Sequence, residues 1–403
     1  MSLWIKNANI ATMDEGNPIA NSAVVIGDFF AYVGDEQGAA AFLAEHPQKE
    51  LTELDCKGQF LLPGFNDSHM HFMHYAKTKM GAELFSCTSM ADLVARMKDF
   101  FENRYDRSSG LWIVGEGWNQ DNFTDEKRFP NNRDLDAVTT EYPILVMRTC
   151  FHVGAMNSKA MELLGINKDT VGKFGEYAEL WPDGTPNGVV KEIVLDDIKC
   201  NLPAPSLDQL LDKLIESQHD LFAYGITSIQ SDDFKYFPDG GAYDMMARIR
   251  KASDRGELKL RMAEQALMYS QEEMETFFDE NGWDDSFGNR SFKISCIKLL
   301  ADGSLGARTA YMRQPYADDA GTRGLTLFTQ EDLNAMVWKA HENNMAAAIH
   351  AIGDGAIEMC LDAIENARKG MPHLHPRHGI VHCQITLISQ VILLMQPIWM
   401  WRM

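Results

Sequence analysis

Residues 61–72 read L-L-P-G-F-N-D-S-H-M-H-F, which is an apolar run, a Pro-Gly turn and two histidines one residue apart. Side chains alternate between the two faces of a β-strand, so a strand here would put His69 and His71 on one face. Two imidazoles on one face at the carboxyl end of a strand can bind a single divalent metal ion. The pattern predicts a first core strand at residues 59–69 with a metal site at its end.

Three later segments repeat the same arrangement. Lys298, His350 and His382 each stand as a single polar residue at or near the end of a short apolar run. A β/α barrel presents its catalytic side chains in this way, at the carboxyl ends of its strands. A lone H-x-H is weak evidence for a metal site. The three later residues make the combination more specific.

These segments resemble the amidohydrolase superfamily, and in particular the third amidohydrolase family, whose members include N-substituted formamide deformylase. The resemblance depends on P-G-F-N-D-S-H-M-H, on I-K-L-L-A-D-G-S-L-G-A-R-T-A, and on H-A-I-G-D-G-A-I followed by H-C-Q. Weaker matches lie at residues 115–118, 151–158 and 182–188. The motifs occur in order from the N-terminus to about Gln384.

The resemblance implies a set of metal ligands. A divalent ion is expected as cofactor, with zinc favoured, as one ion or two. Lys298 would be carboxylated by carbon dioxide and bridge two ions, and Lys298, His350 and His382 would be catalytic. The alternative for Lys298 is an ordinary ion pair, with Asp302 as candidate partner. The expected ligands are His69 and His71 for a first ion, His350 and His382 for a second, and Lys298 between them.

Substrate contacts are predicted at Trp118, His152 and Asp302. The family match suggests that His152, in F-H-V-G-A-M-N-S, touches the substrate. The alternative for His152 is an ordinary hydrogen-bonding role, and the alternative for Trp118 is core packing. The substrate would be a small molecule, and the aromatic residues of 105–200 indicate only an apolar or aromatic portion.

The predicted domain organisation has two parts. Residues 1–58 would supply the N-terminal portion of a small composite β-sandwich, which in the family is completed after the barrel. Residues 59–403 would form a metal-dependent hydrolase barrel of the TIM-like type, incomplete at its C-terminal end. Within it, residues 105–200 lack a clean strand–helix rhythm and are expected to be an insertion that caps the active site.

Hydrophobic periodicity predicts the individual elements. Strands that alternate with helices imply a parallel sheet. The N-terminal part should contain strands at 3–10, 22–26, 29–33 and 51–56 and a helix at 38–46. After the first barrel strand come strands at 144–149, 225–229, 259–268, 292–300, 346–349 and 379–382, and helices at 83–104, 206–224, 242–254, 272–280, 330–343 and 355–368.

Composition excludes several classes of partner. The formal net charge of −21 disfavours nucleic acid and anionic membranes, which both attract basic proteins. No apolar run is long enough to span a membrane, and no signal peptide is visible. The seven cysteines include no C-x-x-C pair, which favours reduced thiols and a cytoplasmic location.

The C-terminal segment departs from the family. Gln396-Pro397 fits a seventh strand, but no eighth strand and no strand-eight aspartate follow, so the chain is expected to be truncated relative to its family. That aspartate would be a ligand and a proton shuttle, so weak catalysis is expected. Open strand edges and the apolar tail at 387–403 favour association, and a homo-oligomer stays among the possible states.

Three functions remain in competition. The leading prediction is a metal-dependent amidohydrolase that hydrolyses a carbon–nitrogen bond other than a peptide bond. A metal-dependent deaminase is the second, although Lys298 and the A-I-G-D that follows His350 argue against it. The third is a truncated, non-catalytic remnant that binds metal without turnover, which the missing aspartate supports.

Overall fold

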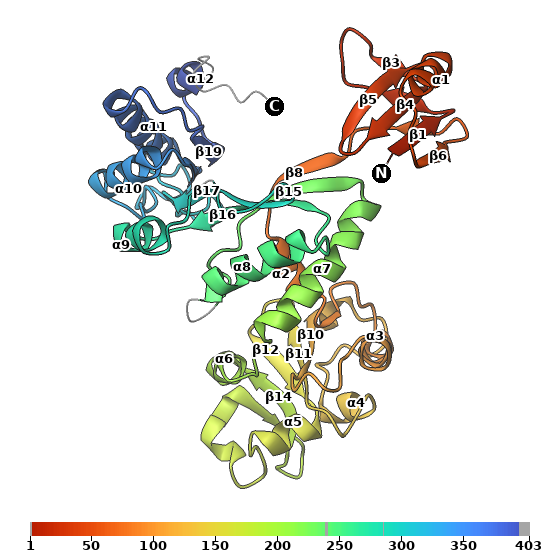
Figure 1. Cartoon of the computed structure of the whole chain (residues 1–403). Coiled ribbons are helices and arrows are strands. Elements are labelled where there is room, and N and C mark those ends of the chain that lie inside the picture. The colour runs from red at the N-terminus through yellow and green to blue at the C-terminus, as the bar shows by residue number, and fades with distance from the viewer. Residues whose placement is uncertain (1, 238–240, 285, 395–403) are drawn as a thin grey trace. The chain divides into compact units, whose positions relative to one another are not determined.

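The computed structural model describes residues 2–237, 241–284 and 286–394. The chain divides into two compact units, the first made of residues 1–67 and 223–228 and the second of residues 68–222 and 229–403. The boundary therefore falls inside two strands, β8 (Phe65–Met70) and β15 (Ile226–Ser231). Each unit is described by itself below (Figure 1).

The first unit contains two small sheets. One has the strand order β5-β4-β1-β6 and the other the order β3-β2-β7. Ile5, Ile10, Ala20 and Ala23, from four different strands, share one hydrophobic cluster. The elements are β1 (Ser2–Lys6), β2 (Asn9–Ala11), β3 (Ile19–Ala20), β4 (Ser22–Ile26), β5 (Phe29–Gly34), α1 (Glu36–Glu45), β6 (Leu51–Asp55) and β7 (Phe60–Leu61). The strand predicted at 3–10 is therefore two strands, and completion of a β-sandwich from elsewhere in the chain stays a prediction.

The strand predicted at 59–69 is also wrong as a single element. Phe60 and Leu61 form β7, which pairs with β2, and a new strand, β8, begins at Phe65. Pro63 has no N–H to give to a ladder, so the chain breaks between them. At Gly64 a Cβ atom would lie 2.2 Å from Oγ1 of Thr227, so the close approach of the two chain segments requires glycine.

Residues 82–200 of the second unit build a sheet with the strand order β13-β14-β12-β11-β10-β9. Strand β11 (Ile144–Arg148) shows how it is packed, because Ile144 and Val146 join one hydrophobic cluster and Leu145 and Met147 join another. This is the alternation of a strand buried on both faces. The other elements are β9 (Ala82–Glu83), α3 (Met90–Asn103), β10 (Ile113–Trp118), η1 (Gln120–Asn122), α4 (Asn132–Asp136), β12 (Val153–Met156), α5 (Ser158–Leu163), η2 (Val171–Tyr177), β13 (Ala178–Leu180), β14 (Pro186–Lys191) and α6 (Glu192–Cys200).

Sequence analysis misjudged two features of this segment. The helix predicted at 83–104 begins only at Met90, because Ser89 caps it by accepting the N–H of Asp92, and Glu83 belongs to β9. The sheet itself was not anticipated, apart from the strand expected at 144–149. The placement of residues 105–200 as a cap stays a prediction.

The remaining strands form the sheet β19-β18-β17-β16-β15-β8. Strands β16 to β19 pair in parallel, with helices between them, and such a sheet fits part of a TIM-like barrel. Helices α10 and α11 pack on each other and on β18 (Figure 1). The elements are α2 (Phe72–Thr78), α7 (Leu207–Ala223), α8 (Gly241–Asp254), β16 (Arg261–Leu267), α9 (Gln271–Glu275), a π-helical turn η4 (Thr276–Glu280), β17 (Phe292–Leu300), α10 (Gln330–Glu342), β18 (Ala346–Ala351), α11 (Asp354–Gly370), β19 (Gly379–His382) and α12 (Ile388–Leu394).

These elements agree closely with the predicted ones, and β17 and β19 have the predicted bounds. The helix expected at 272–280 is instead a short α-helix followed by the π-helical turn. The seventh strand expected at Gln396-Pro397 lies outside the described residues. No helix among the described residues is long and apolar enough to cross a membrane.

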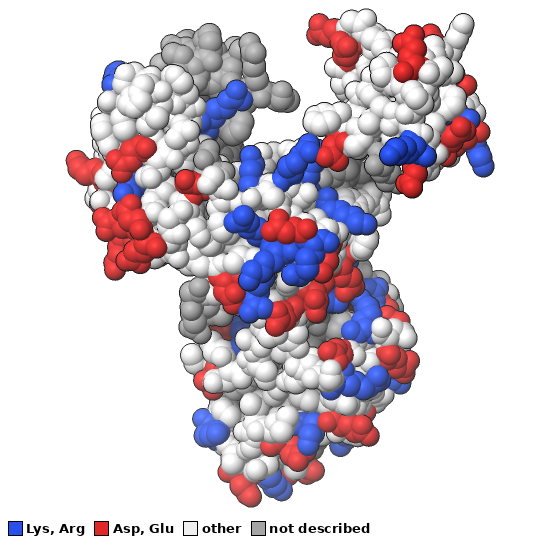
Figure 2. Space-filling view, in the orientation of Figure 1, with Lys and Arg blue, Asp and Glu red and all other residues white. Residues whose placement is uncertain are grey.

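Charged side chains of both signs are spread over the face shown in Figure 2. Acidic side chains gather near α9, which carries Glu272, Glu273 and Glu275. The excess of 58 acidic over 37 basic residues is the cause of the net negative charge.

A buried pair of histidines connects α10 to β18 and β19. Nδ1 of His378 accepts the N–H of Ala347, so the ring proton of His378 is on Nε2. Nε2 in turn lies 2.8 Å from Nδ1 of His341, and Nε2 of His341 donates to the carbonyl of Met371. Every ring nitrogen of the pair is therefore satisfied with both rings neutral. Burial lowers the pKa of His378 to about 3 and also lowers that of His341.

This pair predicts a stability that falls on acidification. Between pH 6.5 and about 3 an unfolded chain binds a proton at His378 that the folded chain excludes, so unfolding gains up to about 1.4 kcal/mol per pH unit. We expect the free energy of unfolding to drop from pH 7.5 to pH 5 by less in His378→Gln than in the unaltered chain. Exposed His219→Gln is the control, and denaturant titrations measure both. An equal drop in His378→Gln would contradict the assignment.

Candidate active site

Four histidines from three strand ends lie together in the second unit. His69 is on β8, His71 directly precedes α2, His350 is on β18 and His382 ends β19. The ring centres are 5.5 Å apart for His69 and His71, 5.6 Å for His69 and His382, and 4.7 Å for His350 and His382. The structure therefore brings all four predicted histidines into one cluster.

His71 reaches the cluster by a different route from the predicted one. Strand β8 ends at Met70, so His71 does not share a strand face with His69. It is the residue before α2, and its side chain caps no N–H of that helix. Nδ1 of His71 lies 2.6 Å from the carbonyl oxygen of Asp232. Because a carbonyl can only accept, Nδ1 carries the proton and Nε2 keeps its lone pair.

The first turn of α2 is held by the end of β15 and the residues directly after it. The hydroxyl of Ser231 accepts the N–H of Phe72, and the carboxylate of Asp233 accepts those of Met73 and His74. The Ser231 hydroxyl also donates to Asp233 at 2.5 Å. These contacts satisfy N–H groups that a helix leaves without partners of its own. They fix the position from which His71 enters the cluster.

Lys298 is almost fully buried on β17, with 1% of its side chain exposed. Its ammonium lies 3.1 Å from Oδ2 of Asp232, so the ion-pair partner suggested by sequence, Asp302, is wrong. The carboxylate of Asp302 instead accepts hydrogen bonds from backbone N–H groups. Glu264 is close enough to Asp232 and Asp233 for their charges to act on it, and complete burial raises its pKa well above the ordinary value.

Asp302 organises the backbone around His350. It accepts N–H groups from Tyr311 at 2.8 Å, Ile352 at 3.0 Å and Gly353 at 2.8 Å, and it is buried. Nε2 of His350 donates to the carbonyl of Gly303 at 3.0 Å and lies 3.4 Å from Oδ1 of Asp302. The lone pair of His350 is therefore on Nδ1. The predicted substrate contact of Asp302 stays a prediction, and both its oxygens already have partners.

His382 stands in an unusual backbone conformation. His382 and Cys383 have φ angles of 70° and 46°, in the left-handed region that non-glycine residues rarely adopt. The N–H of Cys383 donates to the carbonyl of Ala351 on the neighbouring strand, which holds this turn. Backbone strain of this kind concentrates at functional sites.

Electrostatics keep two of the rings neutral. Burial lowers the pKa of His69 below its ordinary value, and the Lys298 ammonium lowers it further. Burial also lowers the pKa of His382, with His350 and Lys298 acting in the same direction. A neutral imidazole is the form that binds a metal ion, so both rings are ready to act as ligands at pH 7.

The donor set fits a divalent metal in its chemistry. Imidazole nitrogens suit zinc and its neighbours, and carbonyl groups fix the tautomers of His71 and His350, as outer partners do in metal sites. Within the described residues, however, no three His, Cys, Asp or Glu side chains stand close enough together to hold an ion as they are placed. Binding would require the rings to turn toward a common point.

Trp118 ends β10, and His152 directly precedes β12, both in the part of the chain that builds the sheet at residues 82–200. Trp118 is fully buried in a hydrophobic cluster, with its ring 5.6 Å from that of Phe129. His152 is exposed, and its Nδ1 lies 2.9 Å from the carboxylate of Glu192. The described contacts of neither residue include the four histidines, and their roles toward a substrate stay predictions.

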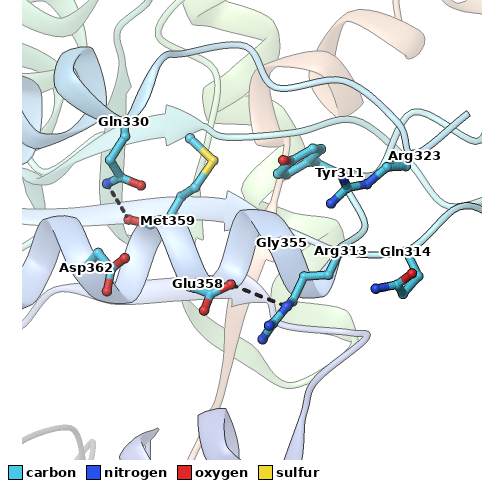
Figure 3. Close-up of a pocket in the computed structure, with 9 residues that line it drawn as sticks. All are labelled: Tyr311, Arg313, Gln314, Arg323, Gln330, Gly355, Glu358, Met359 and Asp362. Carbon is cyan, nitrogen blue, oxygen red and sulfur yellow. Dashed lines mark hydrogen bonds and ion pairs between the residues drawn. The ribbon is translucent and has the colours of Figure 1, made fainter.

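A cavity of about 380 Å³ lies beside the first turns of α11 (Figure 3). Arg313 and Glu358 form an ion pair at 3.6 Å in its lining, and the side-chain amide of Gln330 donates to the carbonyl of Met359. None of the predicted site residues lines it. Its wall residue Tyr311 donates its N–H to Asp302, so the cavity adjoins the backbone that supports His350.

Sequence reasoning missed the segment Ser231–Asp233. A signal was available, because the polar residues 231–233 stand at the carboxyl end of the strand expected at 225–229, where a barrel presents its site residues. Their partners lie about 160 positions away along the chain, which no local pattern specifies.

The contacts of Asp302 predict a structural cost of removing it. Asp302→Ala should lower the free energy of unfolding by about 2–4 kcal/mol, because three N–H groups lose their acceptor. Asp318→Ala, which removes an exposed carboxylate paired with Arg308, should cost less than about 1 kcal/mol. Denaturant unfolding of both variants measures the difference, and equal costs would show that Asp302 does not organise this region.

Comparisons with known proteins place the chain in a family. The chain is 29% identical over 339 residues to the putative amidohydrolase YtcJ of Bacillus subtilis, covering 83% of this chain and 60% of that protein. It is 25% identical over 382 residues to N-substituted formamide deformylase of Arthrobacter pascens, covering 91% of this chain and 66% of that one. An uncharacterized metal-dependent hydrolase from Pyrococcus furiosus matches with a TM-score of 0.68 and 25% identity, over 98% of this chain and 75% of that one. The profile of the amidohydrolase family matches residues 52–392, and the chain belongs to that family.

Proposed function

We propose that the chain is a metal-dependent hydrolase that cleaves a carbon–nitrogen bond other than a peptide bond in a small-molecule amide. The observation that carries this proposal is the cluster of four histidines beside Lys298 at parallel strand ends, in a chain of the amidohydrolase family. The Arthrobacter relative is named for deformylation of N-substituted formamides, which suggests the substrate class to test first.

The four imidazoles would hold the ion or ions, with zinc favoured. Nε2 of His71 and Nδ1 of His350 are the nitrogens left free by the carbonyl groups of Asp232 and Gly303. A divalent ion bound there would supply Lewis acidity toward a carbonyl oxygen and toward water. The half-buried neutral ring of His69 completes the first pair of ligands, and His382 completes the second.

Lys298 would bridge the two ligand pairs after carboxylation. In that reaction its neutral Nζ forms a bond to the carbon of carbon dioxide and loses a proton to solvent, which leaves an anionic carbamate. The ammonium that now pairs with Asp232 would become an anion, so the contact between Lys298 and Asp232 would have to change. Carboxylation of Lys298 would therefore also remove its ion pair with Asp232.

Amide hydrolysis also requires a proton for the leaving amine. His350 and His382 would each use a ring lone pair to hold an ion, so neither ring is assigned this proton transfer. The ring of His350 is held by the carbonyl of Gly303, which fixes the nitrogen that it offers to an ion.

Variants of His71 and its neighbour test the proposed ligands. With Zn²⁺ supplied, His71→Asn should lower kcat/KM for an N-substituted formamide by at least about 10²-fold, because a metal ligand is lost. His74→Asn is the matched control, since His74 follows on α2 but lies against Tyr236. Formate release measures the reaction. Ammonia release from an amidine or aminopurine would favour a deaminase, and metal binding without turnover would favour a non-catalytic remnant.

Lys298→Ala tests the bridging role. The variant should bind fewer ions per chain than the unaltered protein, and bicarbonate should raise metal content only in the unaltered protein, since carboxylation needs the amine. Metal analysis after dialysis gives both numbers. Equal stoichiometry with and without Lys298 would show that the lysine is structural.

A further inference from the structure

We propose that Asp232 is a positioning residue that fixes His71 and Lys298 relative to one another, an inference that rests on the proposed function. Its carbonyl oxygen lies 2.6 Å from Nδ1 of His71, and its carboxylate lies 3.1 Å from Nζ of Lys298. One residue therefore contacts two of the proposed ligands, which lie far apart in the sequence. The family resemblance did not single out this position.

The burial of the ion pair between Lys298 and Asp232 indicates that it fixes positions more than it adds stability. Only 8% of the Asp232 side chain and 1% of the Lys298 side chain are exposed. A buried ion pair gains little over an apolar pair of similar volume, because both charges lose their water. If one side chain moved away, the other would be left as a buried charge without a partner. Each side chain therefore holds the other in position. The pair thus holds the Lys298 amine and the Asp232 peptide in one arrangement.

The peptide of Asp232 is also anchored on its other side. Its N–H donates to the carbonyl of Met70, the residue between the two histidines of the H-x-H motif. The N–H and the carbonyl of Asp232 thus both bind the β8–α2 junction, while its side chain binds β17. Any shift of Lys298 would move the acceptor that fixes the tautomer and direction of the His71 ring.

One oxygen of Asp232 remains available. Oδ1 is buried, and it has no hydrogen-bond partner among the described residues. A buried acceptor without a partner costs free energy, and a bound water, an ion or a ligand commonly satisfies such an atom.

The neighbouring carboxylates of Asp233 and Glu264 make different contacts from Asp232, and Glu264 provides a control. Asp233 is occupied by the N–H groups of α2 and by Ser231. Glu264 accepts the N–H of Asp233 at 2.7 Å, is fully buried and makes no described contact with a proposed ligand. Glu264→Gln keeps the acceptor oxygen and removes the ionisable group. It matches Asp232→Asn in burial and in chemistry.

The first arm of the test needs no metal. Denaturant unfolding is measured for the full chain, Asp232→Asn, Lys298→Met and the double variant. If Asp232 holds Lys298, Asp232→Asn lowers the unfolding midpoint in the presence of Lys298 and by less than about a third as much in the Lys298→Met background. Equal shifts in both backgrounds overturn the proposal. Should Asp232→Asn fail to fold, folding of the double variant supports it, and failure of both overturns it.

The second arm measures metal. Zn²⁺ affinity, from competition with a chromogenic chelator, should fall about 10–100-fold in Asp232→Asn, and the absorption bands of the Co²⁺-loaded protein should shift. Glu264→Gln should stay within about threefold of the unaltered chain. Unchanged affinity and bands in Asp232→Asn overturn the positioning role. If the unaltered chain binds no divalent ion, the proposed function fails, and the unfolding cycle still decides whether Asp232 positions Lys298.

Discussion

The cluster depends on one hydrogen-bonded junction, between the segment Ser231–Asp233 and the first turn of α2. Three consecutive N–H groups of that turn donate to Ser231 and Asp233. The helix has no side-chain cap of its own, and it is only seven residues long. Without this junction its N-terminus would have no fixed position, because so short a helix is not stable alone. His71 would then lose its place beside His69.

A second junction fixes His350 in a similar way, between the end of β17 and the end of β18. Asp302, at the end of β17, binds the N–H groups of Ile352 and Gly353, which follow β18, and of Tyr311 in the long connection between the two strands. At Gly353 a Cβ atom would lie 2.0 Å from the carbonyl oxygen of Tyr311, so the connection packs directly on backbone. In both junctions a buried carboxylate of one strand end fixes the residues that carry a histidine of another.

Much of the architecture can be read from the sequence, because β17, β18 and β19 are rich in apolar residues and helical segments separate them. The four histidines and Lys298 were identified by the same signal, a polar residue at the end of such a run. What failed depends on partners far away in the chain. His71 lies outside β8 because residues 231 and 233 bind the first turn of α2 directly after it. Lys298 pairs with Asp232, although Asp302 is nearer in sequence. Strand β7 separated from β8 because β2 offered it a partner.

The charges at the cluster set a condition on any metal chemistry. A divalent ion among the four imidazoles would repel the ammonium of Lys298, and burial of Lys298 limits how far water can screen that repulsion. Asp232 offsets that repulsion only while its carboxylate stays beside Nζ. Conversion of Lys298 to an anion would instead attract the ion and repel Asp232. The same carboxylate therefore stabilises the ammonium state and opposes the carbamate state, unless a cation stands between the two anions. Under the proposed carboxylation of Lys298, loading of the ion and modification of the lysine would be coupled, and Asp232 would couple them.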